Sequence, residues 1–214
     1  QMENTMNRSR RGVTMLELII VIGLLLILAA LLKPAVQKVR EAAARTQSMN
    51  NMKQLTLAAI NCADTYRGQL PPIAGKANIQ EGSLLFHLLP FIEQDRLFKE
   101  AKGQSWKVAG TVIPLYLDPR DASSADHLFQ NALATTSYAG NWFVFKDGSN
   151  RFPQSITDGT SNTMMFATRN QICDNTPNVW AYSAIYTWAP MFAYYSIEKF
   201  QDNPRPGHCD PKLP

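Results

Sequence analysis

The dominant pattern along the chain is an apolar run near the N-terminus. Residues 18–32 contain fifteen apolar residues in succession, and Glu17 is the one charged residue between Val13 and Leu32. A helix that crosses the hydrocarbon core of a bilayer needs about 20 mostly apolar residues, and residues 13–32 supply that length. Three structures fit such a run: a buried core helix, a secretory signal peptide, and a membrane-spanning helix.

The residues after the run argue against a secretory signal peptide. Such a signal is cut after its apolar stretch, at a site formed by small residues, and is removed. The run is followed by Lys33, Pro34, Ala35 and Val36, which do not form a convincing site of that kind. The sequence therefore favours a membrane-spanning helix that the mature protein keeps.

Basic residues predict the orientation of this helix. Arg8, Arg10 and Arg11 precede the apolar run, and no basic residue lies within it. Positively charged flanks tend to stay in the cytoplasm. We therefore expect a single-pass protein of the inner (cytoplasmic) membrane, with a cytoplasmic N-terminus and a periplasmic or extracellular region after Lys33.

A helical pattern continues beyond the apolar run. Between Lys33 and Tyr66, apolar residues recur at intervals of three and four positions with charged residues between them, which is typical of an amphipathic helix. Joined to the apolar run, this segment predicts one helix of about fifty residues, on the order of 75 Å long. The alternative is two helices separated at Pro34, because an interior proline usually breaks or kinks a helix.

The rest of the sequence predicts a head built from short elements. Five glycines and prolines in residues 67–82 end the long helix. We expect one or two short helices in 83–101, strands in 111–117 and 137–145, a hairpin-type turn at Asp147-Gly148, and a turn at Asp158-Gly159 that leads into another strand. The expected fold class is α+β: a long N-terminal helix, membrane-spanning in its first half, followed by a small globular head of antiparallel strands and short helices.

Glu17 restricts the interpretation of the N-terminus. An ionised carboxylate at the edge of an apolar run costs about 3 kcal/mol or more unless it is paired. Cleavage between Gly12 and Val13 would create an α-amino group four residues from Glu17. Residues 10–18 (RRGVTMLEL), followed by the apolar run, resemble the class III signal of type IV prepilins and pseudopilins.

This resemblance implies a defined processing step. In that family a prepilin peptidase cleaves after the glycine, here Gly12, and methylates the new N-terminus, here Val13, so that the apolar run is kept. Glu17 becomes the fifth mature residue, whose carboxylate the family uses during filament assembly, and Pro34 becomes the twenty-second, where many pilins have a helix-bending proline. Val13 departs from the phenylalanine that is commonest at its position.

Blocks of sequence after the span extend the resemblance to one pilin-like family, domain of unknown function 1559, which is sometimes labelled solute-binding-like. The blocks are 34–45 (PAVQKVREAAAR), 50–55 (NNMKQL), 87–94 (HLLPFIEQ), 137–141 (SYAGN) and 156–163 (ITDGTSNT). Its members usually continue past a proline-rich segment into a glycine-rich stretch, so the resemblance implies a shortened member or a fragment.

Together these features divide the chain into four segments. We expect a leader peptide at 1–12, a transmembrane and assembly helix at 13–32, an amphipathic continuation of that helix at 33–66, and an extracytoplasmic head at 67–214.

Composition and charge argue against a disordered chain and against a nucleic-acid-binding protein. Hydrophobic residues make up 45% of the 214 residues and charged residues 18%, which argues against a disordered chain. The formal net charge of +4 falls to +2 without residues 1–12, because they contain three arginines and one glutamate. The remaining chain has no basic stripe with base-reading residues, so we expect no nucleic-acid partner; DNA binding of the kind some competence pilins show is the alternative.

No residue pattern predicts a catalytic, metal or cofactor site. Residues 158–163 (DGTSNT) are rich in oxygen donors, but they lack the spacing of a calcium loop, and a side-chain-capped turn explains them better. His87, His127 and His208 lie far apart in the sequence, and His87 lies among leucines, as a partly buried structural histidine would. A metal site at 208–210 (HCD) lacks a second set of ligands.

The three cysteines leave one unpaired in any disulfide arrangement. By the family resemblance, Cys173 and Cys209 would close a loop near the chain end, as in many pilins. Cys62 lies on the helical pattern, where a small buried apolar residue is expected. The sequence itself does not fix the connectivity.

An aromatic cluster occupies the C-terminal part of the chain. Trp180, Tyr182, Tyr186 and Trp188 have even spacing, so in a strand they would share one face. That face would either pack in the core, because large aromatic residues dominate burial, or form a surface for a ligand such as a glycan, or for a partner.

The resulting hypothesis is a structural protein and not an enzyme. We expect a pilin-like or pseudopilin-like subunit that a prepilin peptidase processes and that assembles with homologous subunits into a filament or secretion pseudopilus, in contact with inner membrane lipid. The alternatives are a membrane-anchored glycan- or solute-binding module that does not polymerise, a minor pseudopilin of a type II secretion machine that contacts secreted cargo, and an exported hydrolase.

Overall fold

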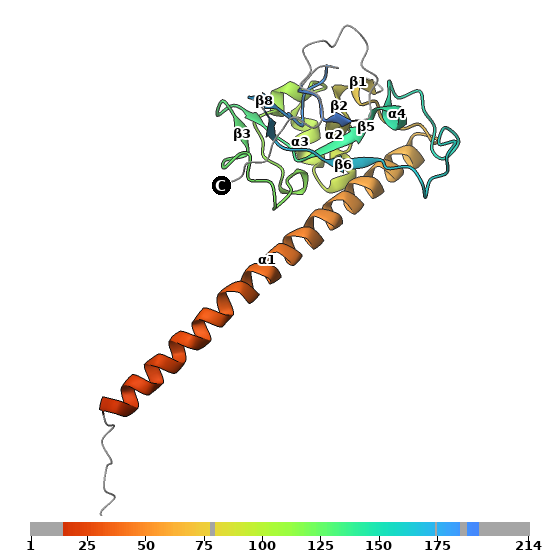
Figure 1. Ribbon diagram of the computed structural model, residues 1–214. Coiled ribbons are helices and arrows are strands. Elements are labelled where there is room, and N and C mark those ends of the chain that lie inside the picture. The colour runs from red at the N-terminus through yellow and green to blue at the C-terminus, as the bar shows by residue number, and fades with distance from the viewer. Residues whose placement is uncertain (1–14, 78–79, 174, 185–187, 193–214) are drawn as a thin grey trace, which may run out of the picture. The chain divides into compact units, whose positions relative to one another are not determined.

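The computed structural model describes residues 15–77, 80–173, 175–184 and 188–192 (Figure 1). The chain divides into two compact units, Gln1–Ala43 and Ala44–Pro214. Each unit is described by itself below.

A single helix, α1 (Met15–Thr65), contains 51 residues and continues through Pro34. The prediction of one helix of about fifty residues is therefore confirmed, and the alternative of two helices separated at Pro34 is wrong. From Met15 to Leu32 the large apolar side chains are between 48% and 78% exposed, on all sides of the helix. By length and composition α1 could cross a membrane, and its most apolar stretch is not buried against any other part of the described chain.

The last third of α1 has a different surface, which is buried on one side. The buried residues recur every three or four positions, as expected for one face of a helix; they are Ser48, Asn51, Leu55, Ala58, Ala59, Cys62 and Ala63. Most of them are small. The helix therefore contributes a narrow stripe to the hydrophobic core of the second unit.

Glycine and a left-handed residue end α1 where the sequence predicts. Arg67 and Gly68 have φ values of 57° and 86°, and the Gly68 amide donates a 2.7 Å hydrogen bond to the carbonyl of Ala63. A left-handed residue after the last turn is a common way to satisfy the free carbonyls of a helix end.

Short elements follow α1. The helices are α2 (Leu84–His87), α3 (Asp95–Glu100) and α4 (Trp142–Phe145), with 3-10 helices η1 (Leu89–Ile92), η2 (Ser105–Val108) and η3 (Pro114–Tyr116). The strands are β1 (Ala74–Ala77), β2 (Gln80–Ser83), β3 (Leu128–Phe129), β4 (Leu133–Ala134), β5 (Tyr138–Asn141), β6 (Phe166–Thr168), β7 (Ile172–Cys173), β8 (Thr176–Pro177) and β9 (Met191–Phe192). The predicted α+β, pilin-like fold class is therefore confirmed.

The strands form four small sheets in the part of the chain that the structure describes. β1–β2, β3–β4 and β7–β8 are antiparallel pairs. The fourth sheet has the order β6-β5-β9, with β5 antiparallel to β6 and parallel to β9. β5 is thus the central strand of this three-stranded sheet.

The core of the head contains several large aromatic side chains. Phe86, Tyr116, Tyr138, Phe145 and Trp180 are among the fully buried residues. Gly140, in β5, is required by close packing, because a Cβ atom there would lie 2.3 Å from Cδ2 of Leu84 and 2.9 Å from Cδ1 of Ile73.

The short helices predicted in 83–101 are confirmed, but the strand predictions are only partly correct. Residues 111–117 form no strand; they contain η3, which Pro114 begins, because proline lacks the N–H that a sheet requires and fits the first turn of a helix. Residues 137–145 divide into β5 and α4, because the Asn141 side chain accepts a hydrogen bond from the Phe143 amide and caps the helix.

Both predicted turns are present, but neither connects the elements that the sequence predicts. Asp147-Gly148 follows α4 and joins no strand pair, so the hairpin prediction is wrong; the Asp147 side chain accepts a 3.0 Å bond from the Ser149 amide instead. The turn at Asp158-Gly159 is present, and the strand after it, β6, begins later, at Phe166.

A buried carboxylate joins the last third of α1 to the rest of the head. Asp118 is 5% exposed and accepts hydrogen bonds from Ser48 Oγ at 2.8 Å and Arg120 Nη2 at 2.7 Å. Tyr138 Oη donates to Ser48 Oγ at 3.3 Å, and Asn51 Nδ2 donates to the Leu117 carbonyl at 3.0 Å. Burial alone would raise the pKa of Asp118, but the hydrogen bonds from Arg120 and Ser48 hold it below its ordinary value. We call Ser48, Asp118 and Arg120 the anchor network.

We predict that Asp118→Ala lowers the free energy of unfolding of the head by about 2–3 kcal/mol, because the buried Ser48 hydroxyl loses a charged acceptor. Urea unfolding of the full chain in detergent micelles measures this change. The matched control is Asp95→Ala, which removes an exposed ion pair with Lys99 and should change the free energy by less than about 0.5 kcal/mol. Equal effects of the two substitutions would show that the anchor network does not stabilise the head.

Candidate functional site

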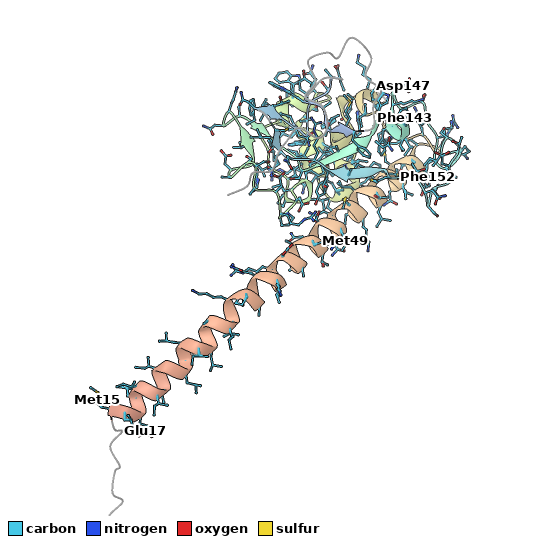
Figure 2. All side chains as sticks on the ribbon, in the orientation of Figure 1. Met15, Glu17, Met49, Phe143, Asp147 and Phe152 are labelled. Atoms are coloured by element: carbon cyan, nitrogen blue, oxygen red, sulfur yellow. The ribbon has the colours of Figure 1, made fainter. Side chains whose placement is uncertain are left out.

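The structure places two of the predicted assembly residues on α1. Glu17 lies in the first turn of the helix, close to Met15 (Figure 2), and its side chain is exposed. Pro34 lies inside the same helix. Gly12 and Val13, the predicted cleavage residues, lie outside the described residues.

The aromatic cluster is only partly a surface. Trp180 is fully buried and its Nε1 donates a 2.9 Å hydrogen bond to the Thr111 carbonyl, so the core interpretation is correct for this residue. Tyr182 and Trp188 are half-buried, with ring centroids 5.7 Å apart. The described residues from 180 to 188 form turns and no strand, so alternation along a strand does not align them. Tyr186 lies outside the described residues.

Cys62 and Cys173 differ in whether they form a disulfide. Cys62 is free and 2% exposed, and burial raises the pKa of its thiol to about 12. The expected small buried residue on the helix is therefore confirmed. Cys173, in β7, is half-buried and disulfide-bonded. Cys209 lies outside the described residues, so its pairing with Cys173 stays a prediction.

The oxygen-rich segment and the histidines have structural roles. In residues 158–163, Asn162 Nδ2 and Thr163 Oγ1 donate 3.1 Å hydrogen bonds to the carbonyls of Asp158 and Gly159, which makes a side-chain-capped turn as predicted. His127 Nδ1 lies 3.0 Å from Gln171 Oε1. Within the described residues no group of three acidic, histidine or cysteine side chains could hold a metal ion. His208 lies outside that part of the chain, as do residues 209–210.

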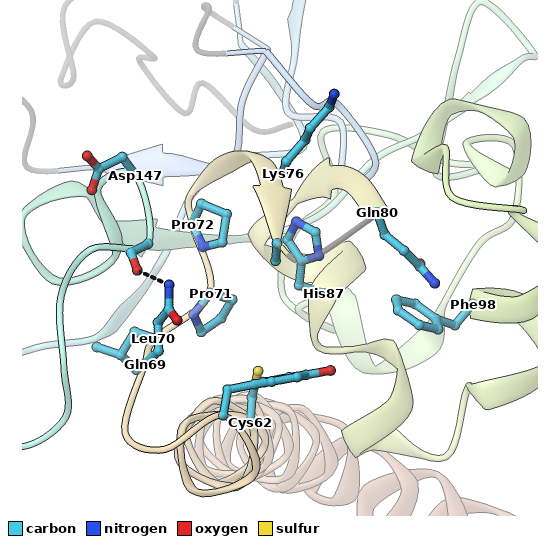
Figure 3. Close-up of a pocket in the computed structure, with 13 residues that line it drawn as sticks. Cys62, Gln69, Leu70, Pro71, Pro72, Lys76, Gln80, His87, Phe98 and Asp147 are labelled. Atoms are coloured by element: carbon cyan, nitrogen blue, oxygen red, sulfur yellow. Dashed lines mark hydrogen bonds between the residues drawn. The ribbon is translucent and has the colours of Figure 1, made fainter.

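The head contains a cavity that the sequence does not predict (Figure 3). Its volume is about 270 Å³. The lining comes from the last turn of α1, the segment 69–72, the β1–β2 pair, α2, α3 and the 147–148 turn; the residues are Cys62, Tyr66, Gln69, Leu70, Pro71, Pro72, Lys76, Ala77, Gln80, His87, Phe98, Asp147 and Gly148. We call this space the α1-end cavity.

A hydrogen bond and close packing fix one wall of the α1-end cavity. Gln69 Nε2 donates to the Gly148 carbonyl at 2.9 Å, which ties the segment after α1 to the 147–148 turn (Figure 3). Gly148 has a φ of 79° and lies against Pro72, where a Cβ atom would be 3.1 Å from Cδ of the proline. The 147–148 turn thus packs directly on the proline segment.

His87 lies at the inner side of the α1-end cavity as a neutral imidazole. It is 5% exposed, and its Nε2 lies 3.2 Å from the Gly75 carbonyl oxygen. Burial lowers its pKa to about 4, although its backbone hydrogen bonds act in the opposite direction. The expected partly buried structural histidine is confirmed, and near neutral pH it brings no charge to the cavity.

Gln80 lines the α1-end cavity, and its side-chain oxygen is unpaired but has almost no accessible surface. Its Oε1 is buried and accepts no hydrogen bond from the protein in the described part of the chain. Figure 3 shows Gln80 beside Phe98 on one side of the space and Pro71 and Pro72 on another. Because these residues are distant in the sequence, no local motif could reveal the cavity.

Two family models match the chain. The model of the prokaryotic N-terminal methylation motif matches residues 7–32. The model SBP_bac_10, described as a protein of unknown function (DUF1559), matches residues 37–108. No curated protein and no solved structure matches the chain.

We predict that His87 makes the head less stable in acid. Because the unfolded chain takes up a proton near pH 6.5 and the folded head only near pH 4, stability is complete above pH 6.5 and falls as the pH drops toward 4, by up to about 3 kcal/mol. Denaturant unfolding of the full chain in detergent micelles at several pH values measures this. His87→Gln should remove most of the loss, and comparison at pH 8 controls for changed packing. If the free energy of unfolding of His87→Gln falls between pH 6.5 and 4 as steeply as that of the wild type, His87 is not the source of the acid sensitivity.

Proposed function

Because the chain is a prepilin-like protein with a class III signal, we propose that it is a pilin-like or pseudopilin-like structural subunit that assembles into a filament or a secretion pseudopilus. The observation that carries this proposal is the match of the methylation motif to residues 7–32, a range that contains the exposed apolar start of α1.

The surface of α1 from Met15 to Leu32 needs a partner that is not water. Its large apolar side chains are exposed on every side of the helix, and a continuous apolar surface of that kind marks contact with a membrane or another protein. Lipid covers it before assembly in this proposal. Copies of the same helix cover it in the filament.

In this proposal Glu17 fixes the axial position of one subunit's helix relative to that of its neighbour. A prepilin peptidase cleaves after Gly12, and the methylated amine of Val13 of one subunit pairs with the Glu17 carboxylate of its neighbour. An unpaired carboxylate in an apolar environment is costly, so subunits that are displaced from the paired position are disfavoured. Pro34 loosens the helix just beyond the apolar segment, because it lacks the N–H for an interior hydrogen bond.

The proposal divides the chain by function. Residues 1–12 are the leader, 13–32 the membrane and assembly helix, 33–66 its amphipathic continuation and 67–214 the head. Three arginines before the span support a cytoplasmic N-terminus. The head is then periplasmic or extracellular, on the side where disulfides such as that of Cys173 persist.

One observation favours a second candidate function. The α1-end cavity gives the head a concave site of about 270 Å³, as a membrane-anchored solute-binding or glycan-binding module would have. The family matches indicate a structural pilin-like protein rather than an enzyme.

We expect the mature protein in an envelope fraction to begin at N-methylated Val13. Mass spectrometry of the N-terminal peptide measures both the start and the added methyl group. Gly12→Val should retain the leader, because the peptidase cleaves after glycine. A mature start after Leu32 would contradict the proposal.

We expect Glu17→Leu to leave processing unchanged and to reduce assembly several-fold. The reason is that the variant loses the carboxylate that pairs with a neighbouring amine but keeps the cleavage residues. Cross-linking in the envelope, followed by counting of linked copies, measures assembly. Glu41→Leu makes the same chemical change at an exposed position of α1 beyond the apolar segment and should assemble normally. Wild-type cross-linking of Glu17→Leu would refute the role of Glu17.

A further inference from the structure

Basic side chains follow the apolar segment of α1 directly. Residues 33–45 contain four basic residues and one acidic residue, Glu41, which gives this stretch a formal charge of +3. All five charged side chains are exposed. We call residues 33–45 the basic segment; its basic residues are Lys33, Lys38, Arg40 and Arg45.

These cations have no carboxylate partner in the described part of the chain. None of the four forms an ion pair there, although Glu41 lies three residues after Lys38 and four before Arg45, spacings at which ion pairs on a helix form. Elsewhere on the surface Lys99 does pair with Asp95, four residues away. The basic segment therefore presents positive charge to whatever surrounds this part of α1.

The charges are distributed around the helix rather than along one face. Lys33 and Arg40 are seven positions apart and so lie on nearly the same side of a helix with 3.6 residues per turn. Lys38 lies about 140° around the axis from Lys33, and Arg45 lies on nearly the same side as Lys38. A protein that packs against α1 would contact one side of it, whereas the headgroup layer of a bilayer surrounds a helix completely. The distribution therefore favours lipid.

Three of the cations also lie close to the end of the apolar segment. Polar headgroups add about 5–8 Å to each side of the hydrocarbon core, and Lys33 directly follows Leu32. At 1.5 Å per residue, Lys38 is about 9 Å and Arg40 about 12 Å beyond Leu32, and their long side chains can extend back toward the interface. Arg45 is about 20 Å beyond Leu32, so its backbone lies more than one screening length, about 8 Å at physiological salt, outside the headgroups.

We propose that the basic segment binds anionic phospholipid headgroups of the bilayer that holds the apolar part of α1, with Lys33, Lys38 and Arg40 at the level of the phosphates. Basic residues beside a membrane surface are attracted to anionic lipid, and ammonium and guanidinium groups donate strong hydrogen bonds to phosphate oxygens. The inference rests on the membrane insertion in the proposed function, but not on filament assembly. It holds for either orientation of the helix, because headgroups line both faces of a bilayer.

Electron paramagnetic resonance of spin-labelled lipids tests this preference. The full chain is reconstituted in phosphatidylcholine vesicles with a trace of spin-labelled phosphatidylglycerol or spin-labelled phosphatidylcholine, and the fraction of each lipid that the protein immobilises gives its association constant. We expect phosphatidylglycerol to associate several-fold more strongly at low salt, and the preference to vanish near 1 M sodium chloride, where the screening length is about 3 Å. Inorganic phosphate at equal ionic strength should act no more strongly than chloride, because the ligand is a bilayer headgroup and not free phosphate.

Substitutions along the basic segment locate the contact. Lys33→Gln should lower the preference for phosphatidylglycerol by up to about five-fold, the attraction of one basic residue to an anionic surface. The triple variant Lys33→Gln, Lys38→Gln and Arg40→Gln should lower it further. Arg45→Gln is the matched control, because it removes the same charge from the same helix at a greater distance, and it should leave the preference nearly unchanged. The arginines before the apolar run remain in every variant, so the differences report only the substituted positions. Far-ultraviolet circular dichroism checks that each variant keeps its helix.

Three results would overturn the proposal. The wild type shows no preference for phosphatidylglycerol, or Arg45→Gln lowers the preference as much as Lys33→Gln does, or the triple variant keeps the preference but loses cross-linking to neighbouring copies in the envelope. The last result would assign the cations to a protein contact.

Failure of the proposed function would give a different result. If α1 does not enter the bilayer, neither lipid is immobilised, and the membrane role and this inference both fail. A chain that immobilises phosphatidylcholine and phosphatidylglycerol equally is inserted, so that only this inference fails.

Discussion

One continuous helix has to satisfy two different environments, and the rest of the molecule depends on how it does so. From Met15 to Leu32 α1 exposes large apolar side chains around its whole circumference, with Glu17 as the one charged residue, so this surface requires lipid or other helices around it. From Ser48 onward only one stripe is buried, and that stripe belongs to the core of the head. The same backbone hydrogen bonds run through both regions, since the helix is unbroken from Met15 to Thr65.

The anchor network explains how the last third of α1 is held in the head. Hydrophobic contact alone is weakly directional, and the buried stripe of α1 consists mostly of alanine, cysteine and serine side chains, which offer little shape to fix a rotation about the helix axis. Asp118 supplies the missing direction, because its carboxylate accepts from Ser48 on the helix and from Arg120 on its own loop. Replacing such a group therefore affects the position of the helix as well as its burial.

Local signals in the sequence were sufficient for the helix and insufficient for the head. The apolar run, the spacing of apolar residues after Lys33 and the glycines and prolines from Gly68 onward are all local, and the observed α1 follows them. In residues 111–117 the β-branched residues favour a strand, but Pro114 removes a donor and a 3-10 turn forms. The anchor network could not be predicted because Ser48 and Asp118 are 70 positions apart, and neither residue is unusual in its own segment.

The deeper part of the α1-end cavity is uncharged near pH 7 although its lining contains titratable residues. Cys62 and His87 could each carry charge, but burial favours the neutral form of both, raising the pKa of the thiol to about 12 and lowering that of the imidazole to about 4. Near pH 7 these two buried groups therefore bring no charge to the cavity, and the charged residues of its lining are Lys76 and Asp147, which are exposed and opposite in sign.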